Sequence, residues 1–239
     1  MQTGEELYNT YVIRKRLGAG GISEVYLAFH KRLQMNMVVK RTRIQQTNVI
    51  QQRTEADILK LLHHPGIPII HDFFRDREFN YVVMEYITGA SFEELLQRDV
   101  SFNQMQVLEY SRQLCQILQY LHGMKPPIIH GDIKPSNVML TKDNTIVLLD
   151  FNVAGFCTSQ SMQVLGFSKA FASPEQQRMN EQIDLRSDIY SLGAWMQALL
   201  PRKKQGIIFR YLVKKAMQEQ VKRRFQSVDE MLKIIKGSS

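Results

Sequence analysis

The residues best suited to chemistry lie in the segment Ile128–Leu140 and shortly after it. This segment contains the carboxylate of Asp132, the ammonium of Lys134 and the carboxamide of Asn137, and a further carboxylate, Asp150, ends the next apolar run. Carboxylate and amide oxygens are suitable ligands for a hard cation such as Mg²⁺. Taken singly, each of these residues would be interpreted as part of a solvated turn, because Asp and Asn are common there.

A glycine-rich segment near the N-terminus could bind phosphate. Gly18, Gly20 and Gly21 lie between two predicted strands, where residues without a Cβ let backbone amides approach phosphate oxygens. Glycine-rich hairpin turns are also common for purely structural reasons, so this segment alone is weak evidence.

A lysine ends the apolar run Met37–Lys40 and needs a partner there. One interpretation is that Lys40 extends its ammonium to solvent from the end of a strand. The functional interpretation pairs Lys40 with Glu55, which would hold the ammonium in place to contact the α- and β-phosphates of a nucleotide.

The elements that must position these residues differ between the two parts of the chain. Up to about Glu85, β-branched and aromatic residues predict strands. The predicted strands are Tyr11–Leu17, Val25–Phe29, Met37–Arg41 and Tyr81–Glu85. One helix is expected between Gln45 and Leu62, because Glu55, Ile58 and Leu59 have helical spacing.

After Gly89 the pattern becomes mainly helical. Ser101 followed by Gln104 suggests a capping box, which predicts a helix over Ser101–His122. Two short apolar runs separated by turn-forming residues predict a β-hairpin. The hairpin strands are Val138–Leu140 and Ile146–Asp150, and further helices are expected over Ser187–Leu200, Ile207–Gln218 and Val228–Ile235.

Together these features resemble the protein kinase superfamily, and most closely the bacterial, eukaryotic-like Ser/Thr kinases. The resemblance covers nearly the whole chain and rests on a series of motifs in a fixed order. The series is the glycine-rich segment, Lys40, Glu55, Asp132, Lys134, Asn137, Asp150 and Ser173–Glu175. It implies a bilobal α+β protein-kinase fold, with a small β-rich N-terminal lobe carrying one helix (residues 1–86), a larger helical C-terminal lobe (residues 87–239) and ATP between them.

The resemblance also implies an activity, which is the ATP- and Mg²⁺-dependent phosphorylation of Ser/Thr hydroxyls on protein substrates. Asp132 would accept or orient the proton of the attacking hydroxyl, and Lys134 would steady the transferred phosphoryl group. Asn137 and Asp150 would bind magnesium. Lysine at position 134 is similar to the Ser/Thr branch of the superfamily, so serine or threonine acceptors are expected over tyrosine.

An adenine pocket follows from the same resemblance. It would consist of apolar side chains above and below the ring, a gatekeeper and two hinge residues that bond through their backbone. These are Val25 and Val38 above the ring, Met139 below it, Met84 as the gatekeeper, and Glu85 and Ile87 as the hinge residues. Val38 stands where the family usually has alanine, which should make the pocket tighter.

Other matches to the family are structural. Asp188 corresponds to a buried aspartate that anchors the catalytic loop, and Glu175 is expected to pair with Arg224. A stacked apolar column is expected as well. Its members are Leu59, Ile70, His130 and Phe151.

Three departures from the family pattern stand out. Gly131 replaces the arginine that would grip a phosphorylated activation loop, so activity is expected not to depend on loop phosphorylation. Asn152 replaces a glycine, but asparagine tolerates a left-handed backbone well. The stretch between Asp188 and Arg224 is shorter than usual, so the helix that often docks substrates should be missing or reduced.

Composition is consistent with a globular chain from a reducing compartment. The chain has 239 residues, of which 44% are hydrophobic, enough for a substantial core. Cys115 and Cys157 form neither a disulfide framework nor a metal-ligand pattern, and Cys115 is expected in the core. No apolar run is long enough to cross a bilayer and Met1–Thr10 does not resemble a signal peptide, so a cytoplasmic location is expected.

The net charge of +8 leaves partners other than a protein substrate open. Nine Lys or Arg residues lie between Arg202 and Arg224, against the single acid Glu219. This cluster could bind acidic proteins or nucleic acid, although a solvated helical face is preferred over nucleic-acid binding. A nucleotide-binding pseudokinase is a further alternative, suggested by Gly131 and Asn152 but opposed by the presence of every phosphate- and metal-binding group.

Overall fold

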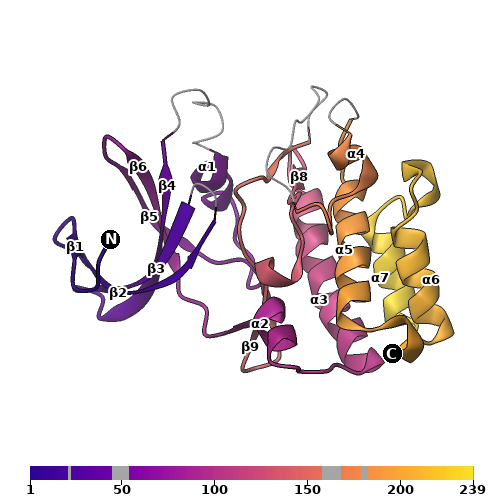
Figure 1. Ribbon diagram of the computed structural model, residues 1–239. Coiled ribbons are helices and arrows are strands. Elements are labelled where there is room, and N and C mark those ends of the chain that lie inside the picture. The colour runs from indigo at the N-terminus through magenta and orange to yellow at the C-terminus, as the bar shows by residue number, and fades with distance from the viewer. Residues whose placement is uncertain (21–22, 45–53, 158–167, 179–181, 239) are drawn as a thin grey trace. The chain divides into compact units, whose positions relative to one another are not determined.

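The computed structural model describes residues 1–20, 23–44, 54–157, 168–178 and 182–238. The chain forms two compact units, Met1–His63 with Pro68–Ile87, and His64–Ile67 with Thr88–Ser239 (Figure 1). The short segment His64–Ile67 belongs to the second unit because it packs there. The carbonyl of Gly66 accepts a hydrogen bond from Leu148 N–H (2.8 Å), and Gly66 lies against Ile117 so closely that a Cβ would not fit.

The first unit is a six-stranded antiparallel sheet with the strand order β1-β2-β3-β4-β6-β5. The strands are β1 (Glu6–Leu7), β2 (Tyr11–Ala19), β3 (Ser23–His30), β4 (Met35–Arg43), β5 (Ile70–Arg75) and β6 (Phe79–Glu85). The four predicted strands are confirmed, each slightly longer than expected. Strand β5 was not predicted, because it is a largely exposed edge strand with polar residues such as His71 and Asp72.

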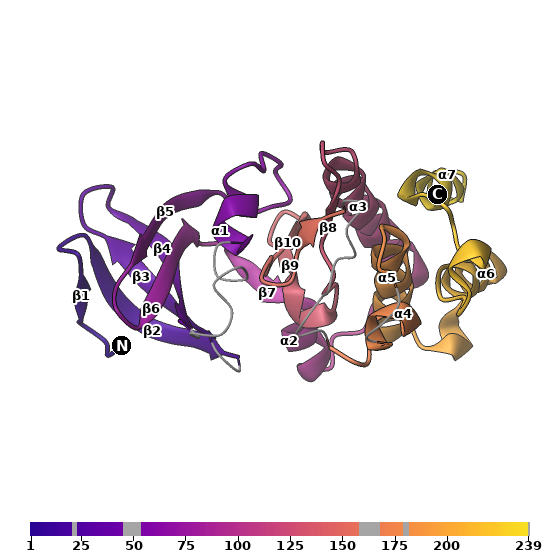
Figure 2. The ribbon, with the colours of Figure 1, turned by 90° about the horizontal axis from the view of Figure 1, so that it is seen from above.

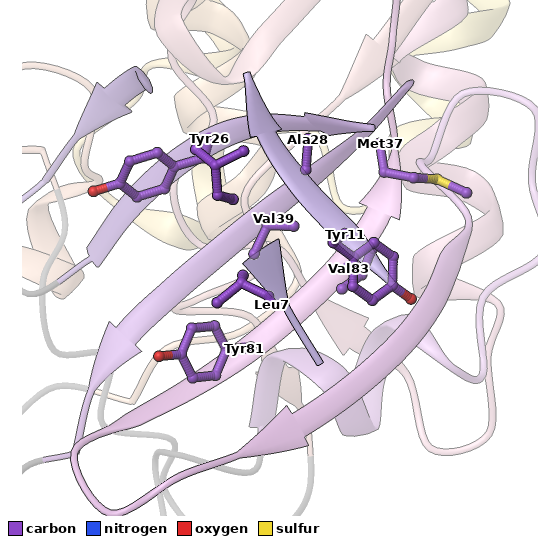
Figure 3. Packing of buried hydrophobic residues seen from close by; sticks show 9 residues of the cluster. Leu7, Tyr11, Tyr26, Ala28, Met37, Val39, Tyr81 and Val83 are labelled. Atoms are coloured by element: carbon purple, nitrogen blue, oxygen red, sulfur yellow. The ribbon is translucent and has the colours of Figure 1, made fainter. Parts of the chain in front are cut away.

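One face of this sheet carries the core of the first unit. Aromatic and aliphatic side chains from the strands pack into a single buried cluster. Its members are Leu7, Tyr11, Ile13, Tyr26, Ala28, Met37, Val39, Tyr81 and Val83. Figure 3 shows these side chains lying close together against the strands. Because side chains alternate along a strand, Val38 and Lys40 lie on the opposite face.

Helix α1 (Thr54–Leu59) is the predicted helix of the first unit. Its residues Glu55, Ile58 and Leu59 are buried, as the helical spacing indicated. The predicted region 45–53 lies outside the described residues. A buried glutamate such as Glu55 requires a partner, because an unpaired buried charge is costly.

The second unit is built on helices. They are α2 (Phe92–Gln97), α3 (Gln104–His122), α4 (Pro174–Gln177), α5 (Arg186–Leu199), α6 (Ile207–Ala216) and α7 (Val228–Lys236). Helix α3 packs against α5 and α7, and α5 packs against α6 (Figures 1 and 2). The fully buried Trp195 of α5 stacks edge-on against Phe92. Cys115 is buried on α3, which confirms its predicted place in the core.

The start of α3 differs from the prediction. The N-cap is Asn103 and not Ser101, because the Asn103 side chain accepts from Gln106 N–H while Gln106 bonds back to Asn103 N–H (both 2.9 Å). Phe102, just before the cap, is buried with its ring edge-on to Tyr110. Ser101 and Asn103 are both followed by a glutamine three residues later. The burial of Phe102 favours a helix that begins after it, with Asn103 as the N-cap.

Short strands flank residues 130–137, which correspond to the catalytic loop of the family that the sequence resembles. β9 (Val138–Thr141) pairs with β10 (Ile146–Leu148) and with β7 (Gly89–Ser91), and β8 (Ile128–Ile129) pairs with β11 (Gly155–Phe156). The predicted hairpin is confirmed, but β10 ends at Leu148, so Asp150 lies beyond the strand. The one-turn 3-10 helices are η2 (Pro135–Asn137), η3 (Arg202–Lys204) and η4 (Val221–Arg223).

Among the helices of the described residues, none combines the length and the apolar composition needed to span a lipid bilayer.

Candidate active site

In the first unit, Lys40 and Glu55 form a buried ion pair. The Lys40 Nζ lies 2.7 Å from Glu55 Oε1, and both side chains are less than a tenth exposed. The predicted pairing is therefore present, although β4 continues to Arg43, so that Lys40 lies within the strand and not at its end. A buried lysine held in this way keeps its ammonium at a fixed position on the sheet.

Strand register places several of the predicted nucleotide-binding residues on the face that carries Lys40. Val25 of β3 is directly opposite Lys40 on β4, and Val38 is directly opposite Met84 on β6. Opposed residues of antiparallel strands point to the same face, so these four side chains share it. All three of the apolar members are half-buried. On this face of the sheet, three apolar side chains therefore lie beside the buried ammonium of Lys40.

The predicted glycines lie beside this face. Gly18 is opposite Val25, and Gly20 donates its N–H to the Ser23 carbonyl (2.8 Å), which closes the turn between β2 and β3. Gly21 lies outside the described residues. Gly18 and Gly20 are exposed, and the space around a Cβ at Gly18 is empty.

In the second unit, the side chains of Asp132, Lys134 and Asn137 converge. Lys134 Nζ lies 2.6 Å from Asp132 Oδ2, and Asn137 Nδ2 donates to the same oxygen (3.1 Å) and to the Asp132 carbonyl (2.9 Å). Ser168 joins this cluster, because its N–H donates to Asp132 Oδ1 (3.2 Å) and its hydroxyl accepts from Lys134 (2.7 Å). Ser168 therefore contacts the Asp132 carboxylate through its backbone and Lys134 through its hydroxyl.

Asp188 of α5 holds the backbone just before Asp132. It is fully buried and accepts from the N–H groups of His130 and Gly131, both at 2.9 Å. Its Oδ2 also lies 3.0 Å from His122 Nε2. Burial raises the pKa of Asp188, but the hydrogen bonds and the nearby histidines lower it more, so the net pKa lies below its usual value. The predicted anchoring role is confirmed.

The second carboxylate, Asp150, has an unusual backbone conformation. Its φ of +63° lies in the left-handed region, which a residue with a side chain seldom adopts. Asn137, which has an amide oxygen, lies in the same unit at the end of η2. Its backbone N–H donates to the Lys134 carbonyl (3.0 Å). A carboxylate and an amide oxygen are the types of ligand that suit Mg²⁺, which in nucleotide sites takes its remaining ligands from phosphate and water.

Comparison with known proteins identifies the family. The protein kinase domain matches residues 11–236. The chain belongs to the protein kinase family. It is 33% identical over 214 residues to the serine/threonine-protein kinase PknB of Mycolicibacterium smegmatis, which covers 84% of this chain and 34% of that protein. It is 35% identical over 214 residues to the probable serine/threonine-protein kinase SCO3848 of Streptomyces coelicolor, with 84% and 31% covered.

A third relative is the PknB of Mycobacterium tuberculosis H37Rv, which is 31% identical over 214 residues, with 84% of this chain and 34% of that protein covered. The chain therefore spans about a third of the length of these relatives. The bilobal α+β fold expected from the sequence is that of this family, with a β-rich unit and a helical unit.

The kinase chain also contains the expected structural ion pair. Arg224 donates to both oxygens of Glu175 at 2.6 Å, and both side chains are almost completely buried. Ser187 donates a further hydrogen bond to Glu175 (2.7 Å). Burial raises the pKa of Glu175, but the hydrogen bonds from Arg224 and Ser187 lower it further, so the pKa ends below its ordinary value.

The structure describes all three departures from the family pattern. Gly131 has a φ of +79°, which glycine adopts without strain, and it carries no side chain to contact a phosphate. Between α5 and α6, residues 200–206 form only η3, so the connection contains no docking helix. Asn152 is exposed and does not have a positive φ, so this position does not require the left-handed backbone that asparagine tolerates.

Two residues of this site were not predicted. His122 contacts Asp188, and the buried Gln176 donates to the Gly131 carbonyl (2.8 Å). Neither had a signal in the sequence, because a histidine at a helix end and a glutamine after a turn are ordinary. Of the expected apolar column, His130 and Phe151 are in contact, with ring centroids 4.9 Å apart.

Proposed function

We propose that this chain is a catalytic protein kinase domain that transfers the γ-phosphoryl group of ATP to serine or threonine hydroxyls of proteins. The observation that carries the proposal is the arrangement of Asp132, Lys134, Asn137 and Ser168, in which a buried carboxylate is held by an ammonium, an amide and a backbone N–H. Such a cluster supplies both a proton acceptor and a positive charge at one place.

ATP would bind to the sheet face that carries Lys40. The ammonium, fixed by Glu55, suits the α- and β-phosphates, and the backbone of Gly18, Gly20 and Gly21 suits the phosphate oxygens. The adenine would contact apolar and hinge residues, which are Val25, Val38, Met84, Met139, Glu85 and Ile87. The Glu85 N–H already donates to the Ile69 carbonyl (2.9 Å), which leaves adenine the carbonyl of Glu85.

Magnesium would be held by Asn137 and Asp150 together with phosphate oxygens. When bound, it neutralises charge on the phosphates during transfer. The lobes that supply these groups are proposed as residues 1–86 and 87–239.

The proposed reaction is an in-line displacement at the γ-phosphorus. The acceptor hydroxyl oxygen forms a bond to the γ-phosphorus while the bond to the β–γ bridging oxygen breaks, and ADP leaves. Asp132 accepts the hydroxyl proton, and Lys134 neutralises charge on the transferred oxygens. Asn137 and the Ser168 N–H keep the carboxylate of Asp132 oriented toward the acceptor.

Two finer features belong to the proposal. Activity does not require a phosphorylated activation loop, because Gly131 offers no cationic side chain to bind it. Acidic proteins are the favoured substrates, because Arg202, Lys203 and Lys204 are exposed cations that could attract them.

The decisive experiment incubates the purified chain with ATP, Mg²⁺ and an acidic protein such as casein, and maps phosphosites by mass spectrometry. Phosphate on serine or threonine is expected. The absence of Mg²⁺-dependent transfer would support a pseudokinase, and phosphate confined to tyrosine would contradict the acceptor assignment. Salt-sensitive binding to DNA without transfer would instead favour a nucleic-acid-binding module.

A further inference from the structure

The residue directly before Asp132 is a glycine, which by itself does little to restrict the backbone. Gly131 has a φ of +79°, which costs glycine nothing, but glycine also has the widest choice of conformations. The peptide group that joins Gly131 to Asp132 determines where the Asp132 side chain begins. A displacement of about 1 Å at such a position can reduce turnover about a hundredfold, so this peptide must be held from outside.

Hydrogen bonds hold this peptide on both sides. Its N–H, which belongs to Asp132, donates to His130 Nδ1 (3.3 Å). Its carbonyl, which belongs to Gly131, accepts from Gln176 Nε2 (2.8 Å). The preceding N–H, of Gly131 itself, is bound by Asp188 (2.9 Å). Gln176 is therefore the group that fixes the carbonyl side.

The carboxamide of Gln176 is itself fixed in one orientation. Gln176 lies on α4, is only 3% exposed, and its Oε1 accepts from both the N–H (2.9 Å) and the hydroxyl (3.0 Å) of Ser173. Since a carboxamide oxygen can only accept, the nitrogen must face the Gly131 carbonyl. The side chain thus bridges the segment that follows Ser168 to the backbone of the catalytic loop.

We propose that Gln176 is a positioning residue for phosphoryl transfer, which orients the Gly131–Asp132 peptide and through it the Asp132 carboxylate. The inference rests on the proposed kinase activity. Beside the contacts that Ser168 makes with Asp132 and Lys134, Gln176 supplies a further contact between the segment that begins at Ser168 and the catalytic loop, where Gly131 has no side chain to make one. This contact is built from neutral groups and needs no phosphate.

The kinetic test compares Gln176→Met with Gln177→Met. Methionine keeps the volume of glutamine but cannot bridge Ser173 and Gly131. Gln177 is the matched control on the same helix, because its Nε2 donates to the carbonyls of Lys169 and Ala172 and not to the catalytic loop. We expect kcat to fall about tenfold or more in Gln176→Met with KM for ATP within about twofold, and to change less than about twofold in Gln177→Met. An equal kcat for Gln176→Met and the unaltered protein would overturn the proposal.

A second variant guards against loss of folding and distinguishes positioning from packing. In Gln176→Glu, an ionised carboxylate repels the Gly131 carbonyl, whereas the protonated acid can donate to it. Burial raises the pKa of such a carboxyl, so protonation occurs as the pH falls toward mildly acidic values. We expect the ratio of variant to unaltered kcat to rise as pH falls from about 8 to about 6. A ratio independent of pH would contradict a role through this hydrogen bond.

Hydrogen exchange gives a readout that does not depend on activity. The amides of Gly131 and Asp132 should exchange about tenfold faster in Gln176→Met than in Gln177→Met, while the amides of α3 are unchanged. If the unaltered chain transferred no phosphate, the proposed function would fail, and exchange alone would still decide whether Gln176 holds the loop. Unchanged exchange at Gly131 and Asp132 would rule the inference out.

Discussion

The catalytic loop and the basic stretch Arg202–Arg223 both concentrate polar groups, but they do so in opposite ways. Around Asp132, whose side chain is buried, donors and acceptors from the same loop and from Ser168, 36 residues away in sequence, meet at 2.6–3.3 Å. In the basic stretch, Arg202, Lys203, Lys204 and Arg223 are exposed, and η3 has no buried residue. The first region is fixed by specific bonds, and the second acts through accumulated charge.

Arg224 shows how burial separates these two behaviours. It directly follows the exposed Arg223, yet it is 2% exposed and bonded to Glu175. A buried charge whose partner is removed is left desolvated and unpaired, whereas exposed charges interact weakly and are screened by salt. Large and specific effects are therefore expected from the buried groups, and small, salt-sensitive effects from the exposed ones.

The largest effect is expected at Asp132. Asp132→Asn removes the proton acceptor but keeps the shape of the side chain, so kcat should fall roughly 10²–10⁴-fold with the fold intact. Asp143→Asn, an exposed turn position, is the control and should leave kcat unchanged. Steady-state kinetics and circular dichroism check both variants. Near-normal turnover in folded Asp132→Asn would refute the mechanism.

The next effect concerns stability. Arg224→Met leaves Glu175 buried and unpaired, and should lower the free energy of unfolding by about 3–5 kcal/mol. Arg223→Met alters the adjacent but exposed arginine and should change it by less than about 0.5 kcal/mol. Urea unfolding measures both. Similar values for the two variants would remove the distinction between buried and exposed basic residues.

Acid should weaken the buried network selectively. The pKa values of Glu175 and Asp188 are lower in the folded chain than their ordinary values of 4.5 and 3.8. Their contribution is therefore present above those ordinary values and is lost as the pH falls through the lower, folded-state values. The free energy of unfolding should decrease below about pH 4.5, and the decrease should be shallower in Glu175→Gln. Equal slopes in urea titrations would contradict this assignment.

A smaller effect is expected from the exposed cations. Reversing Arg202, Lys203 and Lys204 to Glu should slow phosphorylation of casein, because it removes the charge that attracts an acidic protein. It should also flatten the dependence of the rate on salt, because salt screens this attraction over a Debye length of about 8 Å at physiological ionic strength. Reversing Lys142, Lys233 and Lys236, which are also exposed, changes the net charge equally and serves as the control. Identical salt slopes for the two triple variants would show that η3 has no special role.

The smallest effect is expected from dephosphorylation. Because Gly131 has no side chain to bind a phosphorylated loop, phosphatase-treated enzyme should keep most of its activity. Thr158, Ser159 and Ser161 are candidate autophosphorylation sites, and all three lie outside the described residues. Radiometric assays before and after phosphatase treatment measure the effect. A near-complete loss that ATP preincubation restores would contradict phosphorylation-independent activity.

Much of the fold could be predicted because its signals are local. Strands β2, β3, β4 and β6 and the main helices have strong apolar periodicity. The Lys40–Glu55 pair was predicted from a lysine that ends an apolar run and a glutamate at helical spacing, and the Glu175–Arg224 pair from the resemblance to protein kinases. Strand β5 lacked such a signal, because an edge strand needs few apolar residues. The N-cap of α3 could not be decided locally, because Ser101 and Asn103 both have a glutamine three residues later.

The polar contacts that complete the site could not be predicted for a different reason. His122 contacts Asp188, which lies 66 residues away in sequence, and Gln176 contacts Gly131, which lies 45 residues away. No periodicity or composition reports such a contact. The roles assigned to the nucleotide-binding residues and to Asn137 and Asp150 stay predictions until ATP and magnesium binding are measured.

The packing of α7 on α3 has a consequence for how the chain is synthesised. The two helices are distant in sequence, and Gln119 on α3 bonds to Asp229 on α7 across 110 residues. Val228, Met231, Leu232 and Ile235 are all buried on α7. On the ribosome, the second unit therefore cannot complete its core until these residues have emerged from the exit tunnel. Contacts between residues far apart in sequence slow folding, and during translation α3 remains without its partner helix until α7 has been made.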